Sequence, residues 1–174
     1  DVMRTHGIPV VDSVTGTRRQ IAGDMSGVLD RIEKLGSYPL FVKPANMGSS
    51  VGITKCRSRS EMEEGLMDAA RFDRRVLIER SVNAREIEVS VLGNEDPKAS
   101  VVGEVLPSDE FYSYNAKYID GASGLLIPAP VSDSQSEIIR SHAVEAYRAI
   151  DCAGMARVDF FIDKDTGEIF LNEM

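Results

Sequence analysis

Short runs of the chain alternate between apolar and polar residues, which is the pattern of a strand with one buried face. The clearest run is 86–92 (EIEVSVL), in which the acidic and the apolar residues fall on opposite faces. The run 39–44 (PLFVKP) is predicted to pair as a hairpin with 51–56 (VGITKC). Other extended segments are predicted at 7–11, 76–79, 101–106, 155–163 and 168–173. The last two flank a turn at 164–167 and form a second predicted hairpin.

Three other segments have the spacing of amphipathic helices. The first is 26–35. The second is expected to open at a capping box formed by Ser60 and Glu63, and the third at a capping box formed by Ser134 and Glu137. Their expected buried sides consist of Met62, Leu66, Met67 and Ala70, and of Ile138, Ile139, Ala146, Tyr147 and Ile150. Helices mixed with hairpins favour an α+β fold with antiparallel sheets.

Composition and charge narrow the class of protein. The chain has 174 residues, of which 43% are hydrophobic, and it carries 28 acidic and 20 basic residues for a net charge of −8. This is globular composition, sufficient for one domain or two small lobes. An acidic chain lacks the basic footprint of general nucleic-acid or membrane-surface binding. Its longest mostly apolar stretch, 125–131, contains two prolines and is too short to span a bilayer.

The cysteines, the histidines and the absence of common motifs argue against further classes of protein. Cys56 and Cys152 cannot build a disulfide framework and lack metal-site spacing, so we expect reduced thiols in a cytosolic protein. The sequence contains no G-x-x-x-x-G-K-[ST], G-x-G-x-x-G or G-x-S-x-G motif. His6 and His142 have no carboxylate or cysteine partner nearby in sequence, and we expect no histidine-driven catalysis.

A lysine and a loop of small residues form the first candidate site. Lys43 ends a predicted strand, and the loop that follows it contains Gly48, Ser49, Ser50 and Gly52. Such a loop can aim successive backbone N–H groups and two hydroxyls at one point, which suits a phosphate. Lys43 would bring a point charge to the same anion. The alternative is a plain hairpin with a flexible tip, and the motif alone does not separate the two.

The predicted terminal hairpin carries a second candidate site. Alternation places Arg157 and Asp159 on one face of the first strand, and it places Glu173 with Ile169 and Leu171 on the returning strand. The hairpin would bring Asp159 beside Glu173, and such oxygen-rich pairs hold Mg²⁺ with positions left for water and phosphate. Arg157 would stabilise negative charge that develops in a reaction. The alternative is an exposed hairpin with solvated acids.

The segment 111–118 (FYSYNAKY) alternates aromatic with small polar residues and includes a lysine, and turn formers follow it at 120–124. It is expected to be a long ordered loop, and such loops in compact domains are usually functional. The alternative is a surface loop held by buried tyrosines.

The predicted strand at 76–79 leads through a short link into Glu86. A link that leaves the ladder has backbone donors and acceptors able to bind an adenine edge, and Glu86 could accept hydrogen bonds from ribose hydroxyls. The alternative is an ordinary connection between strands.

Together these segments resemble the D-alanine–D-alanine ligase family of ATP-grasp enzymes. The matching stretches, in chain order, are FVKPANMGSSVG, VLIERSVNAREIEVSVLG, FYSYNAKYID, DCAGMARVDFF and FLNEM. The resemblance implies an α+β ATP-grasp fold of two lobes, each with an antiparallel sheet and flanking helices, and with the nucleotide between them. The expected lobes are 1–82, with the Gly/Ser phosphate loop, and 83–174, with the metal hairpin.

The resemblance also implies an activity. Family members are ATP-dependent, ADP-forming ligases that join two D-alanines through a D-alanyl phosphate, for peptidoglycan precursor synthesis. Such chemistry relies on positioning and charge neutralisation rather than on a dedicated base. The implied cofactors are ATP and Mg²⁺ or Mn²⁺, and the implied partner is D-alanine, without nucleic acid or membrane. The full-length protein is expected to be a cytoplasmic homodimer.

The resemblance assigns roles to individual residues. The implied catalytic residues are Ser49 and Tyr118, which close the site, and Arg157, which steadies the acyl phosphate and the tetrahedral intermediate. The implied ATP-binding residues are Lys43, Gly48, Ser50, Glu79, Arg80, Val82, Glu86 and Lys117. Among these, the link 79–82 contacts adenine, Glu86 the ribose, and the lysines and the loop the phosphates. The implied metal ligands are Asp159 and Glu173.

Two alternatives accompany this interpretation. One is a ligase with another acceptor, D-lactate or D-serine, although Tyr118 resembles the D-alanine-specific members. The other is a non-catalytic nucleotide-binding module, which would have lost its charged site residues. The family has an asparagine two positions after the final glutamate and an additional N-terminal domain, and neither is present here. We therefore expect the 174-residue chain to be a piece of a longer protein and inactive alone.

Overall fold

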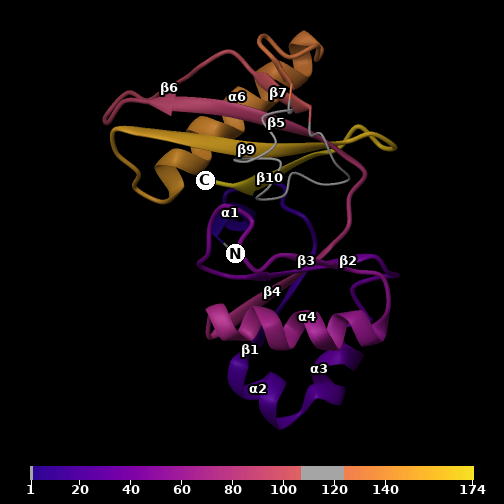
Figure 1. The fold of residues 1–174 in the computed structure, drawn as a ribbon. Coiled ribbons are helices and arrows are strands. Elements are labelled where there is room, and N and C mark those ends of the chain that lie inside the picture. Colours follow the sequence, from indigo (N-terminus) through magenta and orange to yellow (C-terminus); the bar gives the residue numbers. More distant parts are fainter. Residues whose placement is uncertain (1, 107–123) are drawn as a thin grey trace. The chain divides into compact units, whose positions relative to one another are not determined.

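The computed structural model describes residues 2–106 and 124–174, so the predictions on Lys117 and Tyr118 lie outside the described residues. The described chain divides into two compact units (Figure 1). The first comprises residues 12–81, and the second comprises 2–11, 82–106 and 124–174. Both contain an antiparallel sheet with helices, which confirms the predicted α+β class.

The unit 12–81 is a four-stranded antiparallel sheet in the order β1-β4-β2-β3. Its strands are β1 (Ser13–Thr17), β2 (Leu40–Pro44), β3 (Thr54–Cys56) and β4 (Arg75–Arg80). Its helices are α2 (Arg18–Gly23), α3 (Met25–Ile32) and α4 (Arg59–Phe72), which lie on one side of the sheet in Figure 1. The predicted hairpin of 39–44 with 51–56 is confirmed, with a shorter second strand.

Alternation along β2 explains why one face of this sheet is fully buried and the other, here called the open face, is only half-buried. Leu40 and Val42 are fully buried against Ile32, Met62 and Leu66 of the helices. The intervening side chains of β2 are half-buried on the opposite face. Burial of one face against the helices therefore leaves the other face of β2 and its neighbours available for polar chemistry.

The second unit contains a six-stranded sheet. Its main order is β10-β9-β5-β7-β8, and β6 pairs with β5. The strands are β5 (Ala84–Leu92), β6 (Lys98–Ala99), β7 (Gly103–Leu106), β8 (Gly124–Leu126), β9 (Met155–Asp163) and β10 (Ile169–Glu173). The helices are α1 (Val2–Thr5) and α6 (Asp133–Ala149). Side chains of α6, among them Ile139 and Tyr147, share a core with Ile87, Val158 and Phe160 of the sheet, so this sheet also has one covered face.

Both predicted capping boxes are wrong by two residues. The N-cap of α4 is Ser58, whose side chain accepts a hydrogen bond from Glu61 N, and the N-cap of α6 is Ser132, which forms a capping box with Gln135. At the start of each helix the S-x-x-E/Q pattern occurs twice, and the two occurrences start two residues apart. Only the earlier serine has the extended backbone that an N-cap requires.

The expected buried sides of the two long helices are mostly confirmed. Met62, Leu66, Ala70, Ile139, Ala146 and Tyr147 are buried. Met67, Ile138 and Ile150 are not, with 50%, 41% and 46% of their surface exposed. Ile150 lies beyond the last residue of α6, as its C-cap.

Several short elements are absent from the predictions. The strand β1 has the sequence SVTGT and α2 has RRQIAG, neither of which shows a clear apolar period. Of the segment predicted as extended at 7–11, Gly7 lies in a turn with φ 71°, whereas Val10 forms an isolated bridge with Leu171, and Pro9 O accepts a hydrogen bond from Leu171 N. No helix among the described residues is long and apolar enough to cross a membrane.

Candidate functional site

An ion pair lies on the open face of the sheet in the unit 12–81. Lys43 Nζ on β2 is 2.6 Å from Glu79 Oε2 on β4, and the two side chains are only 20% and 17% exposed. The strand register pairs Glu79 with Phe41 and Lys43 with Leu77. The cationic end of Lys43 is therefore held over a partly apolar surface beside a carboxylate.

The loop after β2 has an unusual backbone. Ser49 and Ser50 have φ values of 56° and 59°, and Val51 N donates a hydrogen bond to Gly48 O at 3.2 Å. Two consecutive left-handed residues inside such a bond define a type I′ turn, which normally favours Asn or Gly. Left-handed serines are strained, and such strain clusters at ligand-binding sites.

The surroundings of Gly48 and Gly52 differ in whether they leave room for a side chain. A Cβ added to Gly48 would meet nothing within 4 Å, so packing does not require the glycine there. Gly52 is left-handed, with φ 73°, and an added Cβ would lie 2.9 Å from both Pro44 Cγ and Phe72 Cδ2. Gly52 therefore allows the close approach of the loop to neighbouring side chains, while Gly48 leaves the backbone open.

The link between β4 and β5 matches the predicted break in the ladder. Within the ranges that the structure describes, Ser81 and Val82 take part in no hydrogen bond. Arg80 N, just before them, donates to Asp12 O at 3.1 Å. Asn83 O, just after them, accepts from Lys164 N at 2.8 Å. No described residue therefore satisfies the backbone polar groups of these two link residues.

The open face of the second sheet carries three carboxylates in one row. The register places Glu88 of β5 opposite Asp159 of β9, and Asp159 opposite Glu173 of β10. Arg157 donates two hydrogen bonds to Asp159, Nε to Oδ1 and Nη2 to Oδ2, both at 2.7 Å. Its Nη1 is 3.3 Å from Glu88 Oε1. The hydrogen bonds to Asp159, followed by the charges of Asp159, Glu88 and Glu173, raise the pKa of Arg157 above its usual value.

A register shift brings Glu173 onto this face, which corrects the expected alternation. Leu171 pairs with buried Phe160, but Glu173, two residues on, pairs with Asp159 next to Phe160. The irregularity falls at Asn172. In a strict ladder Glu173 would share the buried side with Leu171, so the extra residue is what turns its carboxylate to the open side.

Glu86 and two phenylalanines form the adjacent row of the same face. Glu86 of β5 lies opposite Phe161 of β9, which lies opposite Phe170 of β10, and all three are half-buried. Two phenylalanines and Glu86 therefore border the carboxylate row. Glu88 is the site residue that the sequence interpretation missed, although the alternation of Glu86 and Glu88 in EIEV had placed both on one face.

The donor set of Asp159 and Glu173 fits a hard divalent cation. Both are carboxylates in register, and each oxygen of Asp159 that accepts from Arg157 keeps a second lone pair. Across 2–106 and 124–174 no group of three or more His, Cys, Asp or Glu side chains is close enough to enclose a metal. Among the described residues, Asp159 and Glu173 would thus supply two carboxylate ligands.

His142 lies on α6, and His6 lies in the turn that follows α1. His6 Nδ1 is 2.8 Å from Glu145 Oε1 of α6, a partner distant in sequence. Burial lowers the pKa of His142, and its Nδ1 has no hydrogen-bond partner within the described parts. Neither histidine contacts a predicted site residue through any described bond.

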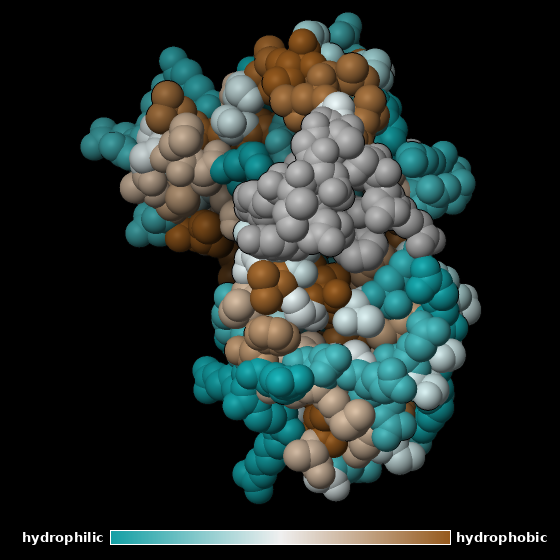
Figure 2. Space-filling model, viewed as in Figure 1, coloured by the Kyte–Doolittle hydropathy of each residue, from teal (hydrophilic) through white to brown (hydrophobic). Residues whose placement is uncertain are grey.

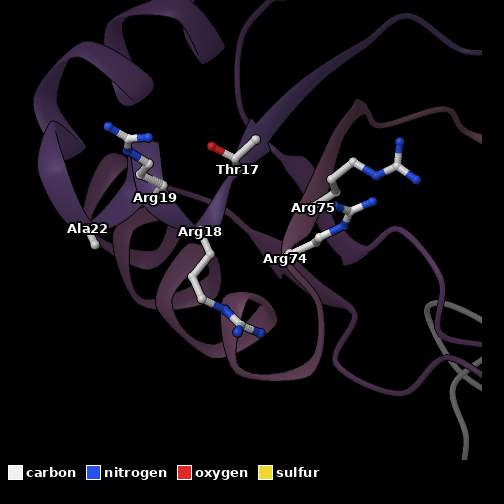
Figure 3. Close-up of a pocket in the computed structure, with 6 residues that line it drawn as sticks. All are labelled: Thr17, Arg18, Arg19, Ala22, Arg74 and Arg75. Carbon is white, nitrogen blue, oxygen red and sulfur yellow. The ribbon is translucent and has the colours of Figure 1, made fainter.

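A separate surface hollow lies where β1 meets α2, beside the turn before β4 (Figure 3). It is lined by Thr17, Arg18, Arg19, Ala22, Arg74 and Arg75, none of which is a predicted site residue. In Figure 3 Arg18 and Arg19 point away from each other, whereas Arg74 and Arg75 extend toward a third side, so the four guanidinium groups are not gathered at one place. They do not converge on one anion position, so the hollow does not define a phosphate site.

Apolar side chains are also exposed together on the second unit (Figure 2). The exposed residues of β7, β8 and their flanks are Val101, Leu106, Leu125, Leu126 and Ile127. They lie at the β8 edge of the sheet, where β8 pairs only with β7 among the described strands. This patch is distinct from the carboxylate row, which lies on β5, β9 and β10.

Comparison with known proteins identifies the family. Residues 2–174 match the family model described as "D-ala D-ala ligase C-terminus". The chain belongs to this family. It is 53% identical over 168 residues to a D-alanine–D-alanine ligase from Acetivibrio thermocellus, covering 97% of this chain and 45% of that protein. It is 52% identical over 174 residues to one from Thermoanaerobacter sp. (strain X514), covering 99% and 48%.

Solved structures agree with this family assignment. The VanG D-Ala:D-Ser ligase from Enterococcus faecalis has a TM-score of 0.84 at 34% identity, over 99% of this chain and 49% of that one. The D-alanine–D-alanine ligase from Coxiella burnetii has a TM-score of 0.77 at 34% identity, over 99% and 44%. The predicted ATP-grasp fold is thereby confirmed. The chain spans about half the length of the curated relatives it matches.

Proposed function

We propose that this chain forms the nucleotide- and metal-binding part of an ATP-dependent, ADP-forming ligase that joins two D-alanines for peptidoglycan precursor synthesis. The observation that carries the proposal is the row of Glu88, Asp159 and Glu173 with Arg157 among them. Three carboxylates beside an arginine on an open sheet face suit a divalent cation and a transferring phosphoryl group. The family relatives at about 50% identity bear the same activity in their names.

The unit 12–81 would hold the nucleotide's phosphates and its base. Lys43 and the N–H groups of the loop Gly48-Ser49-Ser50 suit phosphate oxygens, and Lys117 is proposed to join them. Glu79, Arg80 and Val82 border the link whose backbone groups suit an adenine edge. Glu86, on the second unit, would accept hydrogen bonds from the ribose.

Asp159 and Glu173 would hold Mg²⁺ or Mn²⁺. The ion, when bound, neutralises charge on the β- and γ-phosphates of ATP. Because Asp159 also accepts two hydrogen bonds from Arg157, the residue that would hold the cation also orients this guanidinium. Glu88 holds the third nitrogen of Arg157 and so keeps the guanidinium from rotating away.

Arg157 would act on the substrate itself. The carboxylate of the first D-alanine attacks the γ-phosphorus of ATP, the bond to the leaving ADP oxygen breaks, and a D-alanyl phosphate forms. The amine of the second D-alanine then attacks the acyl carbon, phosphate leaves and the amine loses a proton. Arg157 would stabilise the negative charge on the oxygens in both steps. Ser49 and Tyr118 are proposed to close the site.

D-serine is the second candidate acceptor, because VanG is named a D-Ala:D-Ser ligase. The curated relatives at higher identity favour D-alanine. A non-catalytic role is disfavoured because Lys43, Arg157, Asp159 and Glu173 are all present. We further propose a cytoplasmic homodimer for the full-length enzyme, with small molecules rather than nucleic acid or membrane as partners.

The test is a product assay on the full-length protein that contains this chain. With ATP, Mg²⁺ and equal concentrations of D-alanine, D-serine and D-lactate, the expected main product is D-alanyl-D-alanine with one ADP for each bond formed. The 174-residue chain alone is expected to release no phosphate. A main product ending in D-serine or D-lactate would contradict the proposed acceptor, and ATP-independent or absent turnover would contradict the proposed function.

A further inference from the structure

A buried carboxylate fixes the beginning of the loop 45–53. Asp73 follows α4 and is 8% exposed. Its Oδ2 accepts hydrogen bonds from Asn46 N at 2.8 Å and from Asn46 Nδ2 at 2.5 Å, and its Oδ1 accepts one from Arg75 N at 3.1 Å. Next to this cluster, Ala45 N donates to Arg75 O at 3.0 Å.

Within residues 2–106 and 124–174, only N–H groups contact the carboxylate of Asp73, and no cationic side chain forms an ion pair with it. The N–H of Arg75, then the side chain and backbone of Asn46, lower the pKa of Asp73 against the opposing effect of burial. A buried, ionised carboxylate that accepts hydrogen bonds from the backbone of a loop typically fixes the geometry of that loop.

The residue before Asp73 fixes the other end of the same loop. The ring of Phe72 and the ring of Pro44 pack against Gly52, each within 2.9 Å of where a Cβ would stand. Phe72 is the last residue of α4. Two consecutive residues, Phe72 and Asp73, therefore contact the loop at its end and its beginning, and the left-handed Ser49 and Ser50 lie between these contacts.

We propose that Phe72 and Asp73 form a clamp that holds the loop 45–53 in its phosphate-binding geometry, with Asp73 as a positioning residue for ATP. This inference rests on the proposed function, because it takes the loop to be the phosphate site. Strained residues persist only where the surrounding structure over-determines them. A loop ordered before the ligand arrives also loses less conformational entropy on binding.

The test compares Asp73→Asn with Asp68→Asn in the full-length protein. Asp68 lies on the same helix, is well exposed and contacts only Arg71 through a described bond. Asp73→Asn keeps the shape of the side chain but replaces a charged carboxylate, which accepts hydrogen bonds from three N–H groups, with a neutral amide. We expect amide exchange at Asn46, Val51 and Ile53 to accelerate about tenfold without ligand, and the KM for ATP to rise about tenfold while kcat changes about twofold or less. Asp68→Asn is expected to match wild type.

The outcomes separate the clamp from the proposed function. Unchanged exchange in the loop would overturn the clamp, and so would faster exchange with an unchanged KM, since Asp73 would then have only a structural role. A wild-type protein that does not bind MgATP would overturn the proposed function, and the clamp with it. If Asp73→Asn does not fold, Asn46→Ala removes only the side-chain bond, and we expect a KM rise of about threefold. An unchanged KM in that variant would overturn the proposal.

Discussion

The two units present open sheet faces of opposite chemistry. The unit 12–81 contains 12 basic and 10 acidic residues, whereas the rest of the chain contains 8 basic and 18 acidic residues. On the first face one lysine is paired with one glutamate. On the second face one arginine lies among three carboxylates. The first face therefore suits an anion, and the second suits a cation with the anion attached to it, as MgATP would require.

The two units also differ in the kind of backbone irregularity that they contain. In the unit 12–81 the proposed phosphate loop contains a strained turn at Ser49 and Ser50, and in the second unit a register shift at Asn172 places the third carboxylate in the row. In both units a local departure from regular structure delivers the functional group. The regular strands determine the positions of these irregular residues in each unit.

The largest effect is expected on the carboxylate face. Arg157→Ala should lower kcat about 10²- to 10³-fold with a small change in the KM for ATP, because the guanidinium would stabilise charge that appears only in the reaction. Steady-state kinetics of the full-length enzyme measure this. Arg140→Ala, on α6, is the matched control and should behave as wild type. An equal loss in both variants, or none in Arg157→Ala, would remove the catalytic role of Arg157.

A smaller effect of a different kind is expected on the other face. Lys43→Met should raise the KM for ATP about tenfold or more and change kcat less, because Lys43 would contact phosphate in the bound ground state as well. Glu79→Gln serves as the comparison, since it leaves Lys43 without its partner on the sheet. If Lys43→Met lowered kcat and left the KM unchanged, the assignment of ground-state binding to this face would be wrong.

Local substitutions should affect one unit at a time. Ser58→Ala removes the N-cap of α4 in the unit 12–81, and Ser132→Ala removes that of α6 in the second unit. Each should lower the free energy of unfolding by about 1 kcal/mol. Ser60→Ala and Ser134→Ala should change it by less than about 0.5 kcal/mol. Denaturant unfolding followed by residue-resolved amide exchange would show whether each loss stays within its own unit.

The smallest effect concerns pH. Because the folded-state pKa of Asp73 is lowered, its ionised form contributes stability above the unfolded-state pKa of about 3.9, and this contribution is lost as the pH falls through the folded-state value. The stability difference between wild type and Asp73→Asn should therefore be constant from pH 7 to about pH 5 and shrink below about pH 4. A difference that grows on acidification would contradict the assigned ionisation.

Much of the fold could be predicted from local pattern. The alternation in β2, β5 and β9 reports directly which face is buried, so these strands and the terminal hairpin were predictable. The helix starts were harder, because Ser58 and Ser60 both precede an acid by three residues. Which of the two serines becomes the N-cap of the helix depends on where the preceding strand ends. The end of that strand is set by tertiary packing rather than by the local sequence.

The candidate site was only partly predictable for the same reason. Asp159 and Arg157 share a face by simple alternation, but Glu173 reaches it through a register shift that no period in EIFLNE reveals. Asp73 and Asn46 are 27 residues apart and meet only because α4 packs across β2 and β3. Long-range partners of this kind leave no mark on the local sequence pattern.

Manganese binding tests the central claim most directly. Mn²⁺ would be titrated into the full-length protein with a saturating non-hydrolysable ATP analogue, and free Mn²⁺ followed by its paramagnetic resonance signal. Asp159→Asn and Glu173→Gln should each weaken Mn²⁺ binding about tenfold or more, whereas Asp165→Asn, in the turn of the same hairpin, should not. Unchanged Mn²⁺ affinity in both site variants would contradict the assignment of the carboxylate row.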